Sequence, residues 1–329
     1  MFYTFIRLIE FIMVELALKQ EPILNQPERG RFIEFEGVRG TVFNITAPFE
    51  YNGGTLIAGR IQASKDKSLA STIGIFRQTD DLSYTLINRL PTIGLEDPSI
   101  AHIKGDLIFS CVKTYIKANG DIGYRTLFYK NPDFDNFDPE HDAFAIGQDE
   151  MKDTRLVELQ DGRIGVFPRP QKLVFTSPQR TIDIRGRIGF TILDSLEELA
   201  QAKLTETPLI DIPFKPNEWG GVNAAYLLKD GRIGVLGHIA SVDNKGKHYG
   251  AMVFPFDPNS GVASPIEIIA SREDFPEDPT DGLHDKNYDV VFSGGLRFND
   301  DRTTDFFGGV SDKLPGEIED IQLPAWFKV

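Results

Sequence analysis

The sequence predicts an all-β protein, a five-bladed β-propeller, and three observations support this prediction. A segment with the pattern strand, Asp-Gly turn and strand occurs twice, as LVELQDGRIGVFPRP at 156–170 and as AYLLKDGRIGVLGHI at 225–239. The second copy follows the first by 69 residues, from Asp161 to Asp230, a length that suits a blade of four strands with generous connections. The remainder is rich in strand and turn signals, and the chain contains 30 Gly and 20 Pro, which favour turns between strands.

Three further segments fit the same plan of strand, turn and strand. Residues 41–61 contain an Asn-Gly-Gly turn, residues 96–115 a Lys-Gly-Asp turn, and residues 286–312 an Asn-Asp-Asp turn. Five units in 329 residues leave about 66 residues for each. A tandem array of immunoglobulin-like domains is the rival architecture, but those sandwiches need about 100 residues each. We therefore expect residues 1–39 to form an N-terminal extension and lead-in strand, and residues 40–329 to form a single propeller domain.

Helical signals are scarce. The segment DSLEELAQAKL at 194–204 has the spacing of an amphipathic helix, with Asp194 or Ser195 as its candidate cap. Residues 1–20 are apolar but are interrupted by Arg7, Glu10 and Glu15. No small-residue cleavage site follows them, and the uninterrupted apolar run is too short to span a bilayer. We interpret this stretch as an extension, and we expect no membrane association.

The composition argues against several classes of function. A formal net charge of −14 disfavours extended contact with a nucleic-acid backbone, whereas a small-molecule or oligosaccharide ligand is compatible with it. Cys111 is the single cysteine, so no intramolecular disulfide and no thiolate zinc site can form, and a cytoplasmic location is expected. The five histidines are scattered without the spacing of metal ligands, so we expect no metal site. The sequence carries no indication of the oligomeric state.

Polar residues at the starts of the innermost strands are the candidates for a site, because in a propeller these starts converge on the central channel. The flanks add cations and one histidine. For each residue alone, capping a turn or bonding to neighbouring backbone is an alternative role. The five positions just before the expected inner strands are Asn44, Asp97, Asp153, Asn223 and Asp289. The flanking residues are Arg60, Lys113, Lys152, Arg155, Arg169, His238 and Arg297.

The segment GLEDPSI places two carboxylates side by side. Pro98 restricts the residue before it to extended conformations, which would make Asp97 a rigid platform. Side chains alternate along a strand, so Glu96 and Asp97 are expected to point to opposite faces. We therefore expect one of them to perform proton chemistry and the other to anchor a ligand or the fold.

The cations that begin the third unit suggest an anion site. Lys152, Arg155 and Arg169 could cradle a phosphate, although a cluster of surface salt bridges is the alternative. His238 occupies the strand position equivalent to Arg169 in the repeat. It is either part of the same site or a hydrogen-bonded core histidine.

An ordered series of motifs resembles a known family. The series covers residues 40–312 and is similar to the family labelled domain of unknown function 1861, which is associated with mannosyltransferases and phosphorylases acting on β-1,2-mannan, glycosyltransferase family 108. It is more remotely similar to the mannoside phosphorylases of glycoside hydrolase family 130, which are five-bladed propellers. The motifs are NITAPF (44–49), IAGRI (57–61), LEDPS (95–99), KDTRLVELQDGRIGVFPRPQ (152–171), GRIGF (186–190), LGHIA (236–240), DVVFSGGL (289–296) and FGGVSD (307–312).

The resemblance implies a role for each candidate residue. Asp97 matches the catalytic Asp of the Glu-Asp-Pro motif and would be the general acid, acting through a sugar hydroxyl. No cofactor is implied; phosphate is the co-substrate, and GDP-mannose is a possible donor. The implied phosphate binders are Lys152, Arg169 and His238. The implied sugar or framework contacts are Asn44, Arg60, Glu96, Asp153, Asn223, Asp289 and Asp312, the last matching only part of the family's motif.

The implied reaction is consistent with the residues. Phosphate is already an anionic nucleophile, so an inverting phosphorylase needs one acid and no second carboxylate to activate water. Two alternatives remain open. An inverting glycoside hydrolase would need Asp153 or Asp289 at roughly 6.5–9.5 Å from Asp97. A non-catalytic glycan-binding propeller would expose aromatic rings, whereas 25 Phe against 2 Trp favour use in the core.

Overall fold

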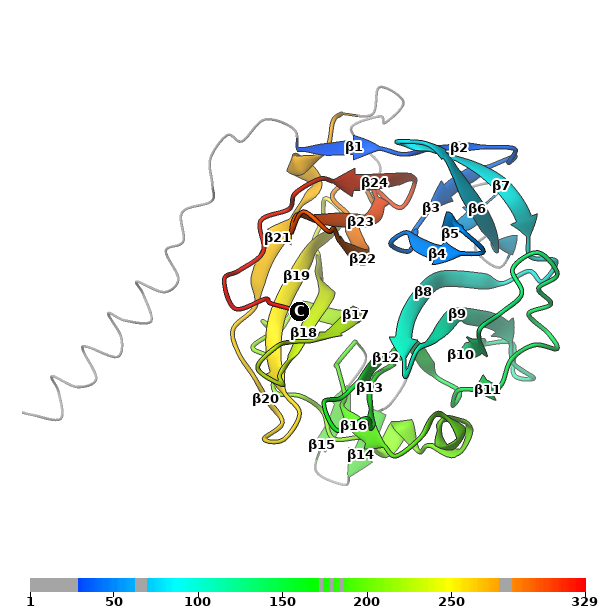
Figure 1. Ribbon diagram of the computed structural model, residues 1–329. Helices are drawn as coiled ribbons and strands as arrows, with labels where there is room; N and C mark the ends of the chain where they lie inside the picture. Colours follow the sequence, from blue (N-terminus) through cyan, green and yellow to red (C-terminus); the bar gives the residue numbers. More distant parts are fainter. Residues whose placement is uncertain (1–28, 63–69, 172–173, 178–179, 184–185, 278–285) are drawn as a thin grey trace, which may run out of the picture.

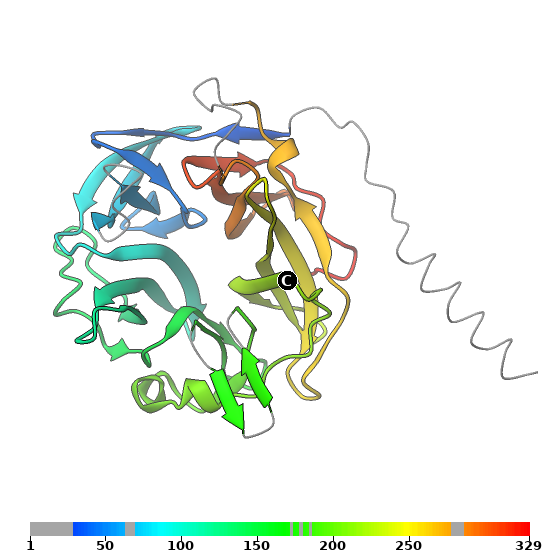
Figure 2. The ribbon, with the colours of Figure 1, turned by 180° about the vertical axis from the view of Figure 1, so that it is seen from behind.

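The computed structural model describes residues 29–62, 70–171, 174–177, 180–183, 186–277 and 286–329. In these residues, five β-sheets stand in a ring around one centre, and the chain is a five-bladed β-propeller (Figure 1). The same ring is visible from the opposite side (Figure 2). The predicted fold class is therefore confirmed. The N-terminal stretch discussed above, residues 1–28, lies outside the described residues.

The blades follow one another along the chain, and each begins with its innermost strand. Blade I contains β3 (Thr41–Phe43), β4 (Phe49–Tyr51), β5 (Gly54–Gln62), β6 (Thr72–Asp80) and β7 (Ser83–Arg89). Blade II contains β8 (Leu95–Ile103), β9 (Asp106–Ile116), β10 (Ile122–Lys130) and β11 (Ala145–Ile146). Blade III contains β12 (Met151–Glu158), β13 (Ile164–Pro170) and β16 (Thr191–Leu193), with the separate hairpin β14 (Val174–Ser177) and β15 (Arg180–Asp183) between them.

The last two blades complete the ring. Blade IV contains β17 (Glu218–Leu227), β18 (Ile233–Val242), β19 (Lys247–Asp257), β20 (Val262–Ala263) and β21 (Glu267–Ala270). Blade V contains β22 (Val291–Phe298), β23 (Thr304–Val310) and β24 (Leu314–Ile318). The two repeated segments form the pairs β12–β13 and β17–β18, as predicted. Their turns carry Gly162 and Gly231 at φ of 81° and 86°, a conformation that glycine adopts without strain.

Two short N-terminal strands hold the ring together. Strand β1 (Gly30–Phe32) pairs antiparallel with β24 and becomes the outer strand of blade V. Strand β2 (Glu34–Glu36) pairs parallel with β7 and becomes the outer strand of blade I. The expected lead-in strand is thus divided between the first and the last blade. Ring closure depends on these backbone hydrogen bonds and on packing between the blades.

Each junction between neighbouring blades contains one apolar cluster, so the inner strands are buried on both sides. Burying such side chains contributes about 1.5–3 kcal/mol each. Many of the phenylalanines lie in these clusters, which agrees with their predicted use in the core. Representative members are Phe49, Leu56 and Phe109 between blades I and II; Ile103, Phe128 and Val166 between II and III; Val157, Phe167 and Val235 between III and IV; Leu236, Val253 and Phe306 between IV and V; and Val42, Phe76 and Phe307 between V and I.

The segment predicted to be an amphipathic helix is instead a short 3-10 helix, η2 (Leu196–Gln201). Ser195 precedes it but makes no capping hydrogen bond through its side chain. Leu196 and Leu199 are the buried residues, and the spacing of three brings them onto one edge of a 3-10 helix. Six residues are therefore enough to bury this edge against blades II and III, and a longer helix is not needed.

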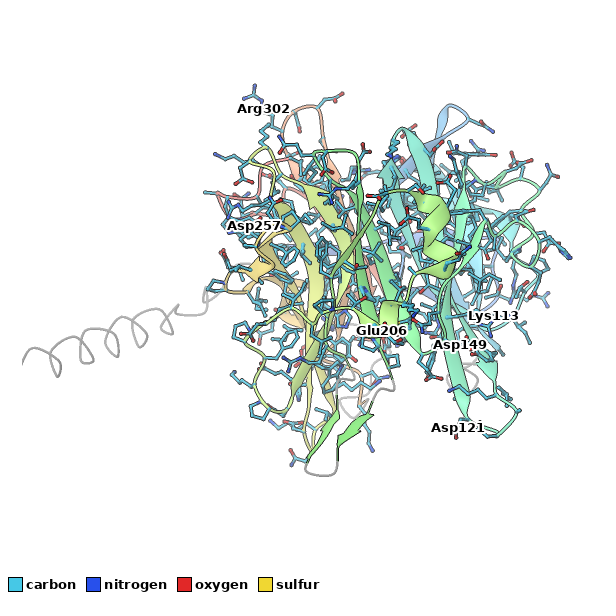
Figure 3. The ribbon with its side chains drawn as sticks, turned by 90° about the horizontal axis from the view of Figure 1, so that it is seen from below. Lys113, Asp121, Asp149, Glu206, Asp257 and Arg302 are labelled. Atoms are coloured by element: carbon cyan, nitrogen blue, oxygen red, sulfur yellow. The ribbon has the colours of Figure 1, made fainter. Side chains whose placement is uncertain are left out.

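The two faces of the ring carry opposite ends of the strands. Asp121 lies at the tip of the β9–β10 hairpin, at one end of the strands, and Arg302 lies in the β22–β23 turn at the other end (Figure 3). Residue Leu95, at the start of the inner strand β8, pairs with Lys113 on β9. The starts of the inner strands therefore lie toward the Asp121 face. Among the residues that the structure describes, no helix is long and apolar enough to cross a membrane.

Candidate active site

The inner strands share an irregularity that directs polar side chains toward the axis. In blades II, III and IV the strand pairing shifts at Asp97, Asp153 and Asn223, respectively. In blade I, Asn44 interrupts the inner strand between β3 and β4. Asn44, Asp97 and Asp153 have φ of 47°, 49° and 50°, in the left-handed region that Asn and Asp tolerate better than most residues. Such bulges turn a side chain out of the ordinary alternation of the strand.

The equivalent position in blade V is a glycine. The pairing of β22 with β23 shifts at Gly294, and a side chain there would collide with the backbone oxygen of Ile45. Asp289, which was expected to hold this position, precedes β22 instead. Its carboxylate contacts Nδ1 of His248 at 2.5 Å, and its side chain is 48% exposed. The structure therefore does not place Asp289 with the four other bulge residues, because the inner strand of blade V has no room for a side chain.

Asp97 of blade II is held by side chains from blades I and III. Nδ2 of Asn44 donates a hydrogen bond of 2.9 Å to Oδ1 of Asp97. Nη1 of Arg60 lies 3.9 Å from the same oxygen, and Nζ of Lys152 lies 3.8 Å from Oδ2. The residue is only 6% exposed. A buried carboxylate held by one amide and two cations has a fixed position, as an acid catalyst requires.

Glu96 does not point away from Asp97 as predicted. Its two oxygens contact Nη2 of Arg60 at 3.2 Å and Nζ of Lys152 at 2.9 Å, so both carboxylates share the same pair of cations. The predictions assumed regular alternation and an extended Asp97 before Pro98. Both are wrong, because Asp97 has a left-handed φ of 49° at the bulge. Burial alone would lower the pKa of Lys152, but Glu96 and Asp97 outweigh it and raise this pKa. Lys152, which also lies 4.8 Å from the ring centre of Tyr124, is therefore charged.

Asp153 is paired with two arginines. It is 1% exposed, and its oxygens lie 3.2 Å from Nη2 of Arg155 and 2.5 Å from Nη1 of Arg169. Burial would raise the pKa of Asp153, but the two guanidinium groups outweigh it and lower this pKa. Asp153 is thus an ionised partner of both arginines. Such a carboxylate is poorly suited to accept a proton from water.

His238 is fully buried beside the two arginines. Its Nδ1 lies 2.8 Å from Oδ1 of Asn223, and its ring stacks on Tyr249 with centroids 5.4 Å apart and planes at 8°. Burial, and then the positive charge of Arg169, lowers the pKa of His238 well below its ordinary value, so the ring is neutral at pH 7. A Cβ at Gly221 would lie 2.7 Å from Cδ of Arg169 and 2.8 Å from Cε1 of His238. Glycine at this position therefore allows the two side chains to approach each other.

Asp312 lies beside these residues in a left-handed turn, with φ of 50°. Burial raises the pKa of Asp312; the charge of Lys247 opposes this, and the charge of Asp97 adds to it. Arg60 and Lys152 also act on it. Two predicted flanking cations lie elsewhere. Nζ of Lys113 donates to the backbone oxygen of Ile93, and Arg297 pairs with Asp305.

Together these residues form a cluster at the propeller axis, which we term the axial cluster. Several of its buried polar atoms have no hydrogen-bond partner among the described residues. An unpaired buried polar atom costs about 1–3 kcal/mol, so their concentration at one place indicates where a polar ligand would supply partners. The axial cluster consists of Asn44, Arg60, Glu96, Asp97, Lys152, Asp153, Arg155, Arg169, Asn223 and His238. The unpartnered atoms in it are Oδ1 of Asn44, Nε of Arg60, Nη1 of Arg155, Nδ2 of Asn223 and Nε2 of His238.

Two residues that the structure places here, Tyr249 and Gly221, had no predicted role. Arg155 was predicted to help cradle a phosphate, and it also bonds Asp153 and the backbone oxygens of Asp97 and Asn223. The sequence does contain a signal for Gly221. Gly220 and Gly221 form a Gly-Gly pair just before Val222, and this pair resembles the Gly-Gly pairs of blade V. Across the described ranges, no three His, Cys, Asp or Glu side chains gather in a way that could hold a metal ion.

Comparisons with known proteins give one family and several similar structures. The profile described as "Protein of unknown function (DUF1861)" matches residues 24–325. A mannose phosphorylase from Leishmania mexicana, in complex with phosphate ion, has 31% sequence identity and a TM-score of 0.73, covering 94% of this chain and 92% of its own. A GDP-Man-dependent mannosyltransferase from the same organism has 27% identity and a TM-score of 0.77, covering 97% of each chain.

A more distant structure shares the fold alone. The β-1,2-mannobiose phosphorylase from Listeria innocua has 16% identity and a TM-score of 0.57, covering 92% of this chain and 93% of its own. A comparison with curated proteins finds no match.

Proposed function

We propose that this chain, which belongs to the family described as protein of unknown function (DUF1861), transfers a mannosyl group between a β-1,2-linked mannoside and inorganic phosphate. The observation that carries this proposal is the charge of the axial cluster. The chain has a net charge of −14, yet this buried cluster combines four cations with three carboxylates. A fourth carboxylate, Asp312, lies beside it, and burial raises its pKa, which favours the neutral form. Excess positive charge at the axis of an acidic protein favours a small anion that reaches the centre of the ring.

The phosphate is proposed to lie on the side of blades III and IV. Arg155, Arg169 and His238 meet there, and Nη1 of Arg155 has no partner among the described residues. Guanidinium groups suit an oxyanion because they donate hydrogen bonds in a planar fork. Lys152 was expected to bind phosphate as well. Since its ammonium contacts Glu96 and lies near Asp97, we place it nearer the sugar.

The sugar is proposed to lie between this anion site and Asp97. Asn44, Arg60 and Glu96 surround Asp97 on the side of blades I and II, and Asp312 approaches from blade V. These groups offer donors and acceptors for the hydroxyls of a mannosyl unit. The position of Asp289, outside the axial cluster, gives it no role in this proposal.

The reaction then needs one proton transfer. A phosphate oxygen attacks the anomeric carbon from the face opposite the glycosidic bond, and the bond from that carbon to the leaving oxygen breaks. Asp97 supplies a proton, through a sugar hydroxyl, to the leaving oxygen. The products are mannose 1-phosphate with inverted anomeric configuration and the shortened mannoside. No general base is required, since phosphate is already an anion.

The hydrolase alternative is disfavoured by the other carboxylates. Asp153 is held by Arg155 and Arg169, and its lowered pKa makes it a weak base. Asp289 is bonded to His248. Neither is free to activate a water molecule opposite Asp97. A non-catalytic glycan-binding role does not explain why a buried acid faces a cluster of cations.

Mannosyl transfer from GDP-mannose is a second candidate. The observation that favours it is the similarity to the Leishmania mexicana GDP-Man-dependent mannosyltransferase, which extends over 97% of both chains. The same acidic and cationic groups would serve this reaction, with a diphosphate in place of phosphate.

One set of incubations separates these functions. Purified protein is mixed with β-1,2-mannobiose, with and without phosphate, and the products are separated by chromatography. Mannose 1-phosphate that forms only with phosphate supports the proposal, whereas mannose released without phosphate supports a hydrolase. Consumption of GDP-mannose in the presence of a mannose acceptor supports the second candidate. Absence of turnover in all mixtures would contradict every catalytic reading.

A further inference from the structure

His238 and Asn223 form a buried pair whose geometry fixes the position of a hydrogen atom. Nδ1 of His238 lies 2.8 Å from Oδ1 of Asn223. A carboxamide oxygen only accepts hydrogen bonds, so Nδ1 must carry the hydrogen in this arrangement. The ring is neutral, and a neutral imidazole has one hydrogen on its two nitrogens. Nε2 of His238 is therefore a hydrogen-bond acceptor with a lone pair.

The pair is held in place from several directions. The backbone oxygen of Asn223 accepts a hydrogen bond of 3.0 Å from Nε of Arg155. The His238 ring stacks on Tyr249 and lies 4.9 Å, between centroids, from Phe292. Gly221 on β17 pairs with His238 on β18 and leaves no side chain between the ring and Arg169. A ring packed in this way keeps one orientation, so the hydrogen bond to Asn223 selects its tautomer.

The unpartnered atoms around this pair are two donors and one acceptor. Nδ2 of Asn223 and Nη1 of Arg155 are donors, Nε2 of His238 is an acceptor, and all three are buried without partners in the described part of the chain. A ligand that satisfies them must offer oxygen atoms with lone pairs and also one hydroxyl hydrogen. Inorganic phosphate has both, because it retains an O–H group throughout the neutral pH range. Sulfate and the diphosphate of a nucleotide-sugar have no such hydrogen.

We propose that Asn223 is a positioning residue that makes His238 a hydrogen-bond acceptor, and that the pair selects hydrogen phosphate over fully ionised oxyanions. The inference rests on the proposed phosphate site and narrows it, since it favours inorganic phosphate over a nucleotide-sugar as the partner of the mannosyl group. A site with an acceptor for a ligand hydroxyl loses affinity for an analogue that lacks this hydroxyl, because two lone pairs then face each other.

Anion binding tests the selection. The full chain is titrated calorimetrically with sodium phosphate and, separately, with sodium sulfate, at pH 7 and equal ionic strength. We expect phosphate to bind at least about tenfold more tightly than sulfate. Equal affinities would overturn the selection and leave the phosphate site intact. Failure of both anions to bind would overturn the selection and the proposed phosphorolysis together.

Two variants test the role of Asn223. Asn223→Leu removes the acceptor for Nδ1 of His238, and the ratio of phosphate to sulfate affinity should fall toward one. Asn88→Leu is the matched control, because it makes the same substitution at a half-buried amide of blade I that lies outside the axial cluster and donates to the backbone oxygen of Phe134. The ratio should be retained in this control. A retained ratio in Asn223→Leu would overturn the positioning role.

The tautomer is measurable without relying on the Asn223 variant. Wild-type protein is labelled with 15N-histidine, and the signal of His238 is identified by its absence in a His238→Gln sample. At pH 7, we expect the hydrogen on Nδ1 and a lone pair on Nε2. A hydrogen on Nε2 would overturn the proposal even if Asn223→Leu does not fold.

Discussion

Two clusters of charged side chains, one buried and one half-buried, differ in how completely their members are paired. The axial cluster leaves Nη1 of Arg155 and Nε2 of His238 without partners among the described residues. The second cluster lies on the side of blade V that faces blade I, and we term it the closure cluster. It consists of Arg31, Arg297, Asp305 and Glu317. In the described part of the chain, none of the side-chain atoms of the closure cluster is buried without a partner.

The contacts of the closure cluster explain its completeness. Nη2 of Arg297 lies 2.8 Å from Asp305 and 3.4 Å from Glu317, and Arg31 lies 3.3 Å from the other oxygen of Glu317. The backbone of Asp320 donates to Asp305 at 3.1 Å. Arg31 is also the direct cross-strand neighbour of Glu317, so the cluster links β1 to β24. A network whose buried polar atoms are all paired stabilises the fold, whereas a network that leaves buried polar atoms unpaired indicates a binding site.

Replacing Asp97 gives the largest expected effect and separates the two clusters by function. Asp97→Asn should lower the rate of phosphorolysis by about 10²–10⁴-fold, the usual contribution of a general acid, with little change in the thermal midpoint. Steady-state release of mannose 1-phosphate and a thermal melt measure both. Asp305→Asn in the closure cluster is the matched variant, and it should lower the thermal midpoint while leaving kcat nearly unchanged. Undiminished turnover by Asp97→Asn would remove the assignment of the acid.

Replacing Asp153 should reduce stability most strongly. Asp153→Asn leaves Arg155 and Arg169 buried without their countercharge, and we expect a loss of about 3–5 kcal/mol in the free energy of unfolding. Urea denaturation gives this value. Asp161→Asn serves as control, because Asp161 is exposed in a turn and pairs only with the neighbouring Arg163, so little change is expected. A similar stability in both variants would show that the axial pairs contribute nothing to folding.

Replacing Arg169 with lysine should weaken phosphate binding more than sugar binding. Arg169→Lys keeps a positive charge near Asp153 but loses the planar fork, so we expect the KM for phosphate to rise about tenfold or more. The KM for β-1,2-mannobiose should change much less. Initial rates with each substrate varied in turn measure the two constants. Equal increases in both would contradict a specific role in phosphate binding.

Replacing Glu317 in the closure cluster should have a smaller effect on the free energy of unfolding, and this effect should depend on pH. Burial raises the pKa of Glu317 to about 7 from an ordinary value near 4.5, although Arg297 and Arg31 oppose this. The folded protein therefore keeps a proton between these pH values that the unfolded chain has released, and the free energy of unfolding falls as pH rises through this range. Glu317→Gln should abolish this slope and raise the thermal midpoint at pH 8 by about 2–4 °C. A slope that persists in the variant would assign it to another group.

The features that could be predicted from the sequence depend on residues that lie close together along the chain. The turns at Asp161 and Asp230 and the number of blades follow from local residues and their spacing. Contacts between blades were not predictable in the same way. Nε of Arg155 meets the backbone of Asn223, 68 residues further along the chain, and no pattern around Arg155 indicates this partner.

The left-handed bulges explain the remaining differences. The expectation that Glu96 and Asp97 diverge required regular alternation, but Asp97 has a φ of 49°. In blade V, the search for a polar residue led to Asp289, whereas close contact with Ile45 requires glycine at the equivalent position. Short-range steric requirements of this kind become visible only when the backbones of two blades are in place.

The pairing of β1 with β24 has a consequence for biosynthesis. A ribosome makes Gly30–Phe32 long before it makes Leu314–Ile318, so the earlier strand has no partner until the last blade has been made. The junction between blades V and I also reaches the centre of the ring, since a side chain at Gly309 would collide with the amide of Asn44, which holds Asp97. A nascent chain that lacks its last blade is therefore expected to be inert. We therefore expect the proposed activity to begin only when β1 and β24 have paired.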